Sequence, residues 1–349
     1  MGPVTPLLAV WDVLRTRYPQ AQGVWVGTPH GPERALVESS GLPFFALAAP
    51  KLSRHQPWTI PWNIMLGLWS LLRAANILRQ QRPNVLLSVG AYVSVPLAVV
   101  AYFMRIPVCI HQLDVVPLLA NRLMAPCAKT ISTTWPQSVS SFSQKKTMCT
   151  GGFARSVLTR ATKETGRRRF ALNENIPCIL VTGGGTGAAS LNTTVTAIVP
   201  ELTAIAYVIH LTGKGKMTTD ALTMSKQFSR YIPIEFLGEG MADALAAADL
   251  VITRAGMGIL CDLVTCGKPA ILIPLPSVHQ IANANAAAKG GAAVMLNPAT
   301  PQTLLQHVQR ILGNEDTRRK MAEGMCTLFP QDAAEQMAKT ALYSARKSR

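Results

Sequence analysis

The sequence predicts an α/β fold with two doubly wound domains that face a cleft. Short apolar segments of strand length alternate with helical segments along the chain, which is typical of parallel sheets covered by helices. Each half also has a glycine-containing turn before its first helix, which indicates a weak internal repeat. The 349 residues, 48% hydrophobic and 15% charged, suit about two globular domains and do not suit a disordered protein.

The first half begins inside a loop. Thr5 and Pro6 suit the cap and first turn of a helix over 7–17, but no strand leads into that helix. We expect this strand and its glycine loop to be encoded in frame upstream of Met1, and upstream DNA without such codons would contradict the expectation. The other elements expected in this half are strands at 24–27, 44–48, 85–89, 108–111 and 129–132, and helices within 51–82, from residue 96 and at 117–124.

The second half repeats the alternation. We expect the domain junction within 150–177, which gives an acceptor-side domain at 1–155 and a second domain at 156–349, whose last helix packs back on the first. The second half begins with a strand at 178–182 and a glycine-rich turn at 183–188. The elements expected after the turn are strands at 206–211, 234–237, 270–273 and 293–296 and one ending at 253, and helices at 189–200 and 241–248, before Gly267, and from residues 279, 301 and 332.

The stretch 251–286 is the segment around which we expect the function to be organised. It is predicted to form a strand, a turn, a helix and a strand, with polar side chains where the strands end, and an open parallel sheet binds its ligand at that edge. Asp262 offers two acceptor oxygens for the two hydroxyls of a ribose, and the alternative is a solvated helix residue. His279, Gln280 and Asn283 form a polar face or, alternatively, a helix-capping region.

The glycine-rich turn resembles a phosphate cradle. Consecutive glycines let backbone N–H groups approach an anion, and the following helix N-terminus adds positive potential. No Gly-Lys-Ser/Thr follows, so the turn is not a Walker A loop, and no acidic residue ends the next strand as a dinucleotide ribose requires. A tight turn without a ligand is the alternative interpretation.

The net charge of +16 predicts an anionic partner, either a phosphorylated ligand or an anionic membrane surface. Nucleic acid is not expected, because aromatic residues are only 6% and do not interleave with basic ones. Seven scattered cysteines without a Cys-x-x-Cys pair are typical of reduced thiols, and a lone His279 does not suggest a metal site. We expect neither a signal peptide nor a transmembrane helix.

A tryptophan-rich segment within 51–82 has two interpretations. Its spacing slightly favours a helix that faces the core, whereas its arginines and the net charge favour a patch at a membrane interface. The residues concerned are Trp58, Trp62, Met65, Leu66 and Trp69.

Taken together, several stretches resemble the MurG family of peptidoglycan glycosyltransferases. The resemblance covers most of the chain, from residue 4 to about residue 297. The matching pieces are VTPLLAV (4–10), VGAYVSVPLAVVAYFMRIP (89–107), HQLDVVPLLANRLM (111–124), TGGFAR (150–155), GGGTGAASLN (183–192) and, most specifically, DLVITRAGMGILCDLVTCGKPAILIPLP (249–276) followed by HQIANANA (279–286).

The resemblance implies a GT-B fold with the donor in the second half and the acceptor in the first. It implies an inverting transfer of N-acetylglucosamine from UDP-N-acetylglucosamine to undecaprenyl-pyrophosphoryl-N-acetylmuramyl-pentapeptide. It also implies a peripheral protein on the cytoplasmic face of the bacterial cell membrane, with the tryptophan-rich segment as its membrane patch. No cofactor follows firmly from the resemblance, and a divalent cation stays open.

Site residues follow from the same resemblance. On the donor side they are Arg155, Gly184, Gly185, Thr186, Gly187, Ala188, Leu237, Met241, Asp262, His279, Gln280 and Asn283. On the acceptor side they are Tyr92, Ser94, His111, Gln112 and Asn121.

The sequence departs from the family pattern at the proposed base. The family's first glycine loop ends in a His often assigned as the base, and Pro3, which cannot take a proton, stands in that place. We therefore expect Asp114 to serve as the catalytic base. Two alternatives remain open: a sugar-nucleotide-binding protein of this fold without transferase activity, and a UDP-sugar epimerase with a GT-B fold.

Overall fold

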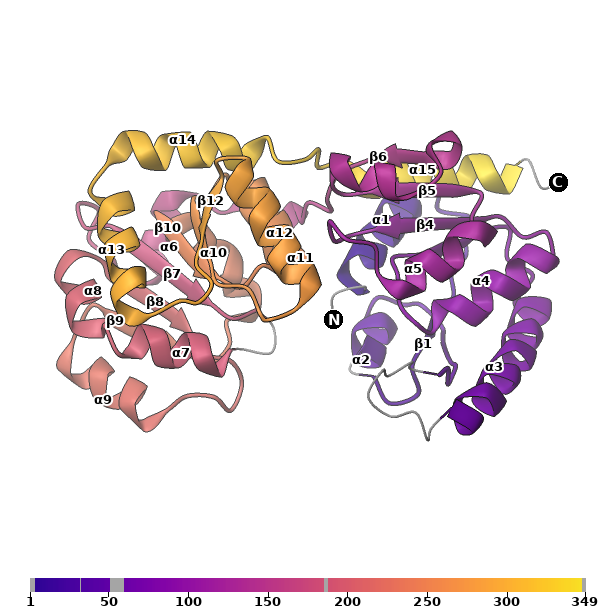
Figure 1. The fold of residues 1–349 in the computed structure, drawn as a ribbon, viewed down its shortest axis with the longest axis horizontal. Helices are drawn as coiled ribbons and strands as arrows, with labels where there is room; N and C mark the ends of the chain where they lie inside the picture. The colour runs from indigo at the N-terminus through magenta and orange to yellow at the C-terminus, as the bar shows by residue number, and fades with distance from the viewer. Residues whose placement is uncertain (1–3, 32, 51–59, 185–187, 347–349) are drawn as a thin grey trace. The chain divides into compact units, whose positions relative to one another are not determined.

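The computed structural model describes residues 4–31, 33–50, 60–184 and 188–346, without the side chains of residues 60–63, 156, 159, 239 and 346. Of the predicted site residues, Trp58, Gly185, Thr186, Gly187 and the side chain of Trp62 lie outside this description. The chain divides into two compact units between Phe153 and Ala154 (Figure 1). Unit 1 also includes the segment from Asp332 onward, and unit 2 ends at Gln331.

Unit 1 contains two parallel sheets, one with the order β1-β2 and one with the order β3-β4-β5-β6. The strands are β1 (Trp25–Gly27), β2 (Phe44–Ala46), β3 (Leu86–Ser88), β4 (Val108–Gln112), β5 (Thr130–Thr133) and β6 (Thr147–Cys149). The helices are α1 (Val4–Arg17), α2 (Glu33–Ser39), α3 (Ile60–Gln81), α4 (Ser94–Phe103), α5 (Leu119–Met124) and α15 (Ala333–Arg346).

Both faces of the four-stranded sheet are covered, as β4 shows. Val108 and Ile110 belong to an apolar cluster with Leu97 of α4. The Cys109 thiol lies 3.8 Å from the Ser344 hydroxyl of α15. Because side chains alternate along a strand, α4 and α15 cover opposite faces. The C-terminal helix therefore belongs to unit 1, where it also packs against α1.

Unit 2 contains one parallel sheet with the order β12-β11-β10-β7-β8-β9. The strands are β7 (Cys178–Thr182), β8 (Tyr207–Leu211), β9 (Tyr231–Ile234), β10 (Leu250–Thr253), β11 (Ala270–Leu272) and β12 (Ala293–Met295). The helices are α6 (Lys163–Arg169), α7 (Ala189–Thr196), α8 (Val199–Ile205), α9 (Thr219–Gln227), α10 (Met241–Ala247), α11 (Met257–Cys266), α12 (Val278–Lys289), α13 (Pro301–Leu312) and α14 (Glu315–Cys326).

The core of unit 2 explains the strands that the sequence predicted. All five residues of β7 are buried, and alternate residues of β7, β8, β10 and β11 pack with α7, α8 and α13 in one apolar cluster. Apolar runs of this kind are expected in a parallel sheet covered on both faces. The predicted fold class, two doubly wound α/β domains of the GT-B type, is confirmed.

Some predicted boundaries are wrong. The strand expected at 234–237 is β9, which ends at Ile234 and includes Pro233, because an edge strand tolerates proline. The helix expected at 189–200 is two helices, because Pro200 lies in the first turn of α8, where its missing N–H is not needed. The sequence analysis missed five short or strongly polar elements, which are α2, α6, α9, α14 and β6.

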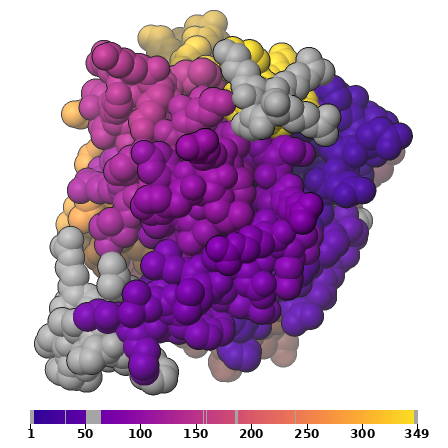
Figure 2. All heavy atoms as spheres, turned by 90° about the vertical axis from the view of Figure 1, so that its right-hand side faces the viewer, coloured from indigo at the N-terminus to yellow at the C-terminus, as the bar shows by residue number. Residues whose placement is uncertain are grey.

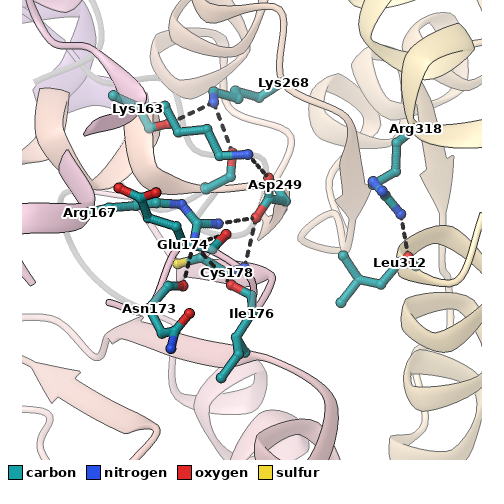
Figure 3. Close-up of polar contacts among 12 residues, drawn as sticks. Lys163, Arg167, Asn173, Glu174, Ile176, Cys178, Asp249, Lys268, Leu312 and Arg318 are labelled. Carbon is teal, nitrogen blue, oxygen red and sulfur yellow. Dashed lines mark hydrogen bonds and ion pairs between the residues drawn. The ribbon is translucent and has the colours of Figure 1, made fainter. Parts of the chain in front are cut away.

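An ion-pair cluster at the amino edge of the unit 2 sheet holds α6 in place (Figure 3). Asp249 accepts hydrogen bonds at 2.7 Å from both Lys163 and Arg167, and at 2.9 Å from the amide of Cys178. Arg167 also donates to the carbonyls of Asn173 at 2.8 Å and Ile176 at 3.0 Å. Part of the basic run at 163–169 is therefore structural and is not free to bind an anionic partner.

Asp249→Asn is expected to lower the free energy of unfolding by about 2 kcal/mol at pH 7, because hydrogen bonds from charged donors are lost. Burial by itself raises the pKa of Asp249, but the bonds from Lys163 and Cys178 bring that pKa below its usual value. The contribution of ionised Asp249 to the free energy of unfolding is therefore present at neutral pH, and it is lost as the pH falls below about 4. Urea unfolding at pH 7 and pH 3 measures this, with Asp316→Asn, from an exposed pair with Arg319, as the neutral control.

Candidate functional site

Three strands of unit 2 end side by side at the carboxyl edge of its sheet. Thr182 at the end of β7 pairs with Thr253 at the end of β10, which in turn pairs with Leu272 of β11. The glycine-rich turn, the 254–256 turn and the 273–277 loop follow these strands. In an open parallel sheet, the ligand binds at this edge.

The described residues on either side of the glycine-rich turn have specific contacts. Gly184 has a φ of 80°, which favours glycine, and its amide lies 3.3 Å from the Thr182 hydroxyl. Asn192 of α7 donates to the Thr212 carbonyl at 2.9 Å and lies 3.2 Å from the ring of His210. These contacts fix the start of α7 behind the turn. The phosphate cradle formed by Gly184 to Ala188 stays a prediction.

Arg254 connects the turn after β10 to the loop after β11 and to α7, and the sequence analysis missed its importance. It is 6% exposed and donates to the Ile273 carbonyl at 2.9 Å and the Ser190 hydroxyl at 2.6 Å. Its hydrogen-bond partners among the described residues are neutral, and burial lowers the pKa of Arg254. A buried cation with neutral partners favours an anionic group nearby. The sequence signal was an arginine placed directly after a short strand that is apolar except for its last residue, Thr253.

Arg155 and Asp262, two predicted donor-binding residues, form a two-pronged ion pair. Nε of Arg155 donates to one carboxylate oxygen at 2.7 Å, and Nη2 donates to the other oxygen. The side chain of Asp262 is 7% exposed and that of Arg155 is 34% exposed. Burial raises the pKa of Asp262, and the hydrogen bond from Arg155 opposes that rise. Each oxygen of Asp262 keeps a further lone pair, so the carboxylate is a pre-oriented acceptor and not a free one.

His279, Gln280 and Asn283 lie in the first two turns of α12. Gln280 accepts a hydrogen bond from the Leu275 amide at 3.0 Å, and the buried Asn283 donates to the Ala255 carbonyl at 3.1 Å. Both side chains therefore tie α12 to the neighbouring loops. The predicted polar face is present, and two of its three members position the backbone.

Three buried polar atoms at this edge have no hydrogen-bond partner within the described ranges. They are Oγ1 of Thr253, Nε of Arg254 and Nδ1 of His279. Buried polar atoms are almost always paired, so a cluster of orphans indicates a ligand or ordered water. A Cβ added at Gly256 or Gly258 would meet nothing within 4 Å, so there is open space at the start of α11.

Leu237 lies directly before the short turn that leads into α10, and Met241 is the first residue of α10. Both are half-buried, and the Leu237 carbonyl accepts a hydrogen bond from the Gly240 amide at 2.9 Å. No described contact joins them to the three loops, and their donor role stays a prediction.

In unit 1, the predicted acceptor-side residues His111, Gln112 and Asn121 are buried around the end of β4. Asn121 donates to the Gln112 side chain at 2.6 Å and to the His111 carbonyl at 3.1 Å. Gln112 in turn donates to the carbonyls of Asp114 at 2.8 Å and Val116 at 3.1 Å. These side chains shape the loop after β4, and the half-buried Asp114 lies in that loop.

The loop after β3 meets this network. Gly90 has a φ of 100°, and a Cβ there would lie 3.0 Å from Nδ2 of Asn121. Tyr92 in the same loop is 38% exposed, and Ser94 is the first residue of α4. Tyr92 and Asp114 are therefore more accessible to an acceptor than the buried His111, Gln112 and Asn121.

His111 is held neutral in the interior. Its ring nitrogens lie 2.8 Å from the Ser132 hydroxyl and 2.9 Å from the Thr134 hydroxyl. Burial lowers the pKa of His111 to about 3. In this position His111 does not act as an accessible base near neutral pH.

Unit 1 should lose stability as the pH falls below the ordinary His pKa of about 6.5, because His111 takes up a proton in the unfolded state but not in the folded state. The expected loss is about 1.4 kcal/mol per pH unit. His111→Gln, which keeps a donor and an acceptor, should remove this slope. All six tryptophans precede residue 154, so tryptophan fluorescence during urea unfolding at pH 7 to 5 reports on unit 1. The exposed His30→Gln is the control, and an unchanged slope in His111→Gln would contradict the assignment.

The predicted membrane patch is only partly exposed. Met65 and Trp69 of α3 are 57% and 49% exposed, so the core-facing interpretation is wrong for them, whereas Leu66 is half-buried. Figure 2 looks onto the side of unit 1 where α3 and α4 lie, in purple. Further exposed apolar residues on these helices are Ile64, Leu68, Leu72, Tyr102 and Phe103. None of the described helices is long and apolar enough to span a membrane.

The described residues contain no group of three or more His, Cys, Asp or Glu side chains placed to hold a metal ion. None of the seven cysteines, all of which lie within the described ranges, forms a disulfide. The carboxylate of the candidate site, Asp262, is engaged by Arg155.

Comparisons with known proteins identify the family. The N-terminal domain of glycosyltransferase family 28 matches residues 1–133, and its C-terminal domain matches residues 178–337. The UDP-N-acetylglucosamine–N-acetylmuramyl-(pentapeptide) pyrophosphoryl-undecaprenol N-acetylglucosamine transferase of Clostridium kluyveri is 33% identical over 319 residues, which cover 89% of this chain and 88% of the relative. The chain belongs to the MurG family of glycosyltransferases.

Solved structures agree with the fold of the MurG family. MurG from Acinetobacter baumannii is similar with a TM-score of 0.76 and 23% identity, over 97% of this chain and 96% of that one. A UDP-GlcNAc 2-epimerase from Neisseria meningitidis, crystallised with UDP-GlcNAc, has a TM-score of 0.70 and 13% identity, over 97% and 96% of the two chains. At these identities the likeness concerns the fold, and the MurG family assignment rests on the sequence relatives.

Proposed function

We propose that this chain transfers N-acetylglucosamine from UDP-N-acetylglucosamine to undecaprenyl-pyrophosphoryl-N-acetylmuramyl-pentapeptide. Membership of the MurG family is the observation that carries the proposal. In the proposed reaction, an acceptor hydroxyl attacks C1 of the donor sugar with inversion while UDP leaves. This step needs positive potential at the leaving diphosphate and a base for the hydroxyl proton.

The carboxyl edge of the unit 2 sheet supplies the features that a nucleotide diphosphate needs. The buried Arg254 provides a cation without a carboxylate partner among its described contacts. The amides at the start of α7 add to the positive potential on the diphosphate. Asp262, oriented by Arg155, accepts the ribose hydroxyls. Gln280 and Asn283 hold the loops that surround the sugar nucleotide.

Unit 1 takes the lipid-linked acceptor in this proposal. Asp114 accepts the proton of the attacking hydroxyl, since it is the half-buried carboxylate in the loop after β4. The exposed apolar residues of α3 and α4 rest on the membrane surface that carries the acceptor. The net charge of +16 suits an anionic bilayer, which makes the protein a peripheral one on the cytoplasmic face of the cell membrane.

A transfer assay with UDP-N-acetylglucosamine and a soluble analogue of the lipid acceptor tests the activity. The product should gain the mass of one N-acetylhexosamine, and one UDP should be released for each product. The chain should be assayed as given and with an N-terminal extension from in-frame upstream codons. Asp114→Asn should lose most turnover and keep donor affinity, because the proposed base acts on the acceptor.

Binding of the sugar nucleotide without transfer is the second candidate. Two observations favour it: Pro3 stands where the family has a basic His, and the nearest His in the resembling segments, His111, is buried and neutral. Calorimetry with UDP-N-acetylglucosamine separates the two candidates. Donor binding with no product from either chain favours a binding protein, and product formation excludes it.

A further inference from the structure

The chain passes from one unit to the other twice. The first crossing follows Phe153, and the second crossing precedes Asp332. An antiparallel bridge pairs Phe153 with Asp332, and the Ala333 amide beside it donates to the Gly152 carbonyl at 3.3 Å. The two crossings are therefore hydrogen-bonded to each other on the side of unit 1.

On the side of unit 2, both crossings are attached to the same helix, α11. Arg155, the second residue after the first crossing, holds the carboxylate of Asp262 in the two-pronged ion pair. Gln331, the last residue before the second crossing, accepts a hydrogen bond from the Thr265 hydroxyl at 2.7 Å and donates to the Val264 carbonyl at 3.1 Å. Side chains three positions apart on a helix are neighbours. The attachment of the second crossing thus lies next to Asp262.

The amide group of the half-buried Gln331 caps the end of α11. The Val264 carbonyl lies in the last turn of the helix, where carbonyls have no amide partner four residues further on. Each partner of Gln331 also has a second contact. The Thr265 hydroxyl lies 2.8 Å from the Cys261 carbonyl, and the Val264 carbonyl also accepts a bond of 3.4 Å from the Gly267 amide. The Gln331 contact can therefore open without leaving a buried polar group unpaired.

We propose that Gln331 is a positioning residue of the donor site, which holds α11 in the orientation that presents Asp262 to the sugar nucleotide. This inference rests on the proposed function, because it takes α11 as the helix that binds the ribose. Coupling between two binding events is reciprocal. If the Gln331 contact favours the donor, a bound donor favours the contact and stabilises the bridge at Asp332.

Gln331→Met tests the proposal, because it removes both hydrogen bonds and keeps a side chain of similar length. Calorimetry should show about tenfold weaker binding of UDP. In the transfer assay, the KM for UDP-N-acetylglucosamine should rise about tenfold while kcat changes by less than about twofold. Gln336→Met is the matched control, since the Gln336 amide donates to Asp332 within unit 1 at 2.8 Å. This control should bind UDP as the original chain does.

A second pair of variants changes the other partner of the contact. Thr265→Val removes the hydroxyl at nearly constant volume and should weaken UDP binding about fivefold, whereas Thr265→Ser keeps the hydroxyl and should restore the affinity. Thr265→Val combined with Gln331→Met should bind UDP no more weakly than Gln331→Met alone, because both substitutions act through one contact. Additive losses would contradict a shared contact.

Amide hydrogen exchange at Ala333 distinguishes positioning from a purely structural role. In the original chain, saturating UDP should slow this exchange about tenfold, because the bound donor stabilises the Gln331 contact and the bridge next to it. In Gln331→Met, UDP should leave the exchange unchanged. A purely structural Gln331 would change the exchange equally with and without UDP.

Three results overturn the inference. The first is UDP binding to Gln331→Met as tight as to the original chain, and the second is equal protection of Ala333 by UDP in both chains. Either result leaves the proposed function intact. The third is a failure of UDP to bind the original chain, which removes the proposed function and this inference with it.

Discussion

Arg155→Ala is expected to lower the free energy of unfolding of unit 2 by about 3 kcal/mol at pH 7, because it leaves the buried carboxylate of Asp262 without its cation. Asp262→Ala should cost less stability, because the guanidinium left behind is one-third exposed and can be hydrated. Both variants should lose affinity for UDP-N-acetylglucosamine, since the carboxylate is either removed or no longer oriented. The two substitutions therefore separate a structural effect from a binding effect.

The pH dependence gives this prediction a second readout. The pKa of Asp262 is raised by burial, so keeping the folded carboxylate ionised costs stability as the pH rises from about 4 through the raised value. Without Arg155 this pKa rises further. The stability gap between Arg155→Ala and the original chain should thus be small in acid and grow toward neutral pH.

Arg155→Lys is the matched control, because it keeps the charge but not the two-pronged geometry. Far-UV circular dichroism follows the unfolding of both units, and tryptophan fluorescence follows unit 1 and should not change. Calorimetry measures donor affinity. If Arg155→Ala kept the stability and the donor affinity of the original chain, the ion pair would not be part of the donor site.

The parts of the fold that were predictable from the sequence are those with a local signal. Cys178–Thr182 and Leu250–Thr253 are apolar runs of strand length, and both are buried strands of the unit 2 sheet. The strand containing Pro233 was misplaced, because only the finished sheet shows that it is an edge strand. Helices such as α6 and α14 were missed, since their charged residues hide the apolar spacing.

The candidate site was predictable as a set of positions but not as a set of roles. The edge of the sheet where Asp262, Gln280 and Asn283 would gather follows from strand order and loop chemistry. That Arg155 engages Asp262 across 107 positions of sequence is a tertiary contact without a local signal. Burial is equally invisible in the sequence, and it makes the predicted acceptor-side residue His111 a neutral group of the interior.

Replacing Leu68, Trp69 and Leu72 of α3 together by Ser should weaken binding to anionic liposomes by about a thousandfold. These side chains are 61%, 49% and 72% exposed in the folded protein. Burying the exposed part of each side chain in the interfacial region of a bilayer contributes about 1.4 kcal/mol, so the three together contribute about 4 kcal/mol, and every 1.4 kcal/mol is tenfold. The variant should keep its stability within about 0.5 kcal/mol, because these residues lie on the surface.

The control removes exposed apolar side chains elsewhere. Leu222→Ser combined with Phe236→Ser changes residues of unit 2 that are 49% and 59% exposed, and it should leave liposome binding intact. Sedimentation with anionic and zwitterionic liposomes at low and high salt then separates the apolar part of the binding free energy from the electrostatic part. The apolar part should be lost in the α3 variant at every salt concentration. The electrostatic part, from exposed basic groups such as Arg73 of α3 and Arg105 in the turn after α4, should be screened by salt in every variant. Unchanged liposome binding by the triple variant would show that this face of unit 1 does not dock to a membrane.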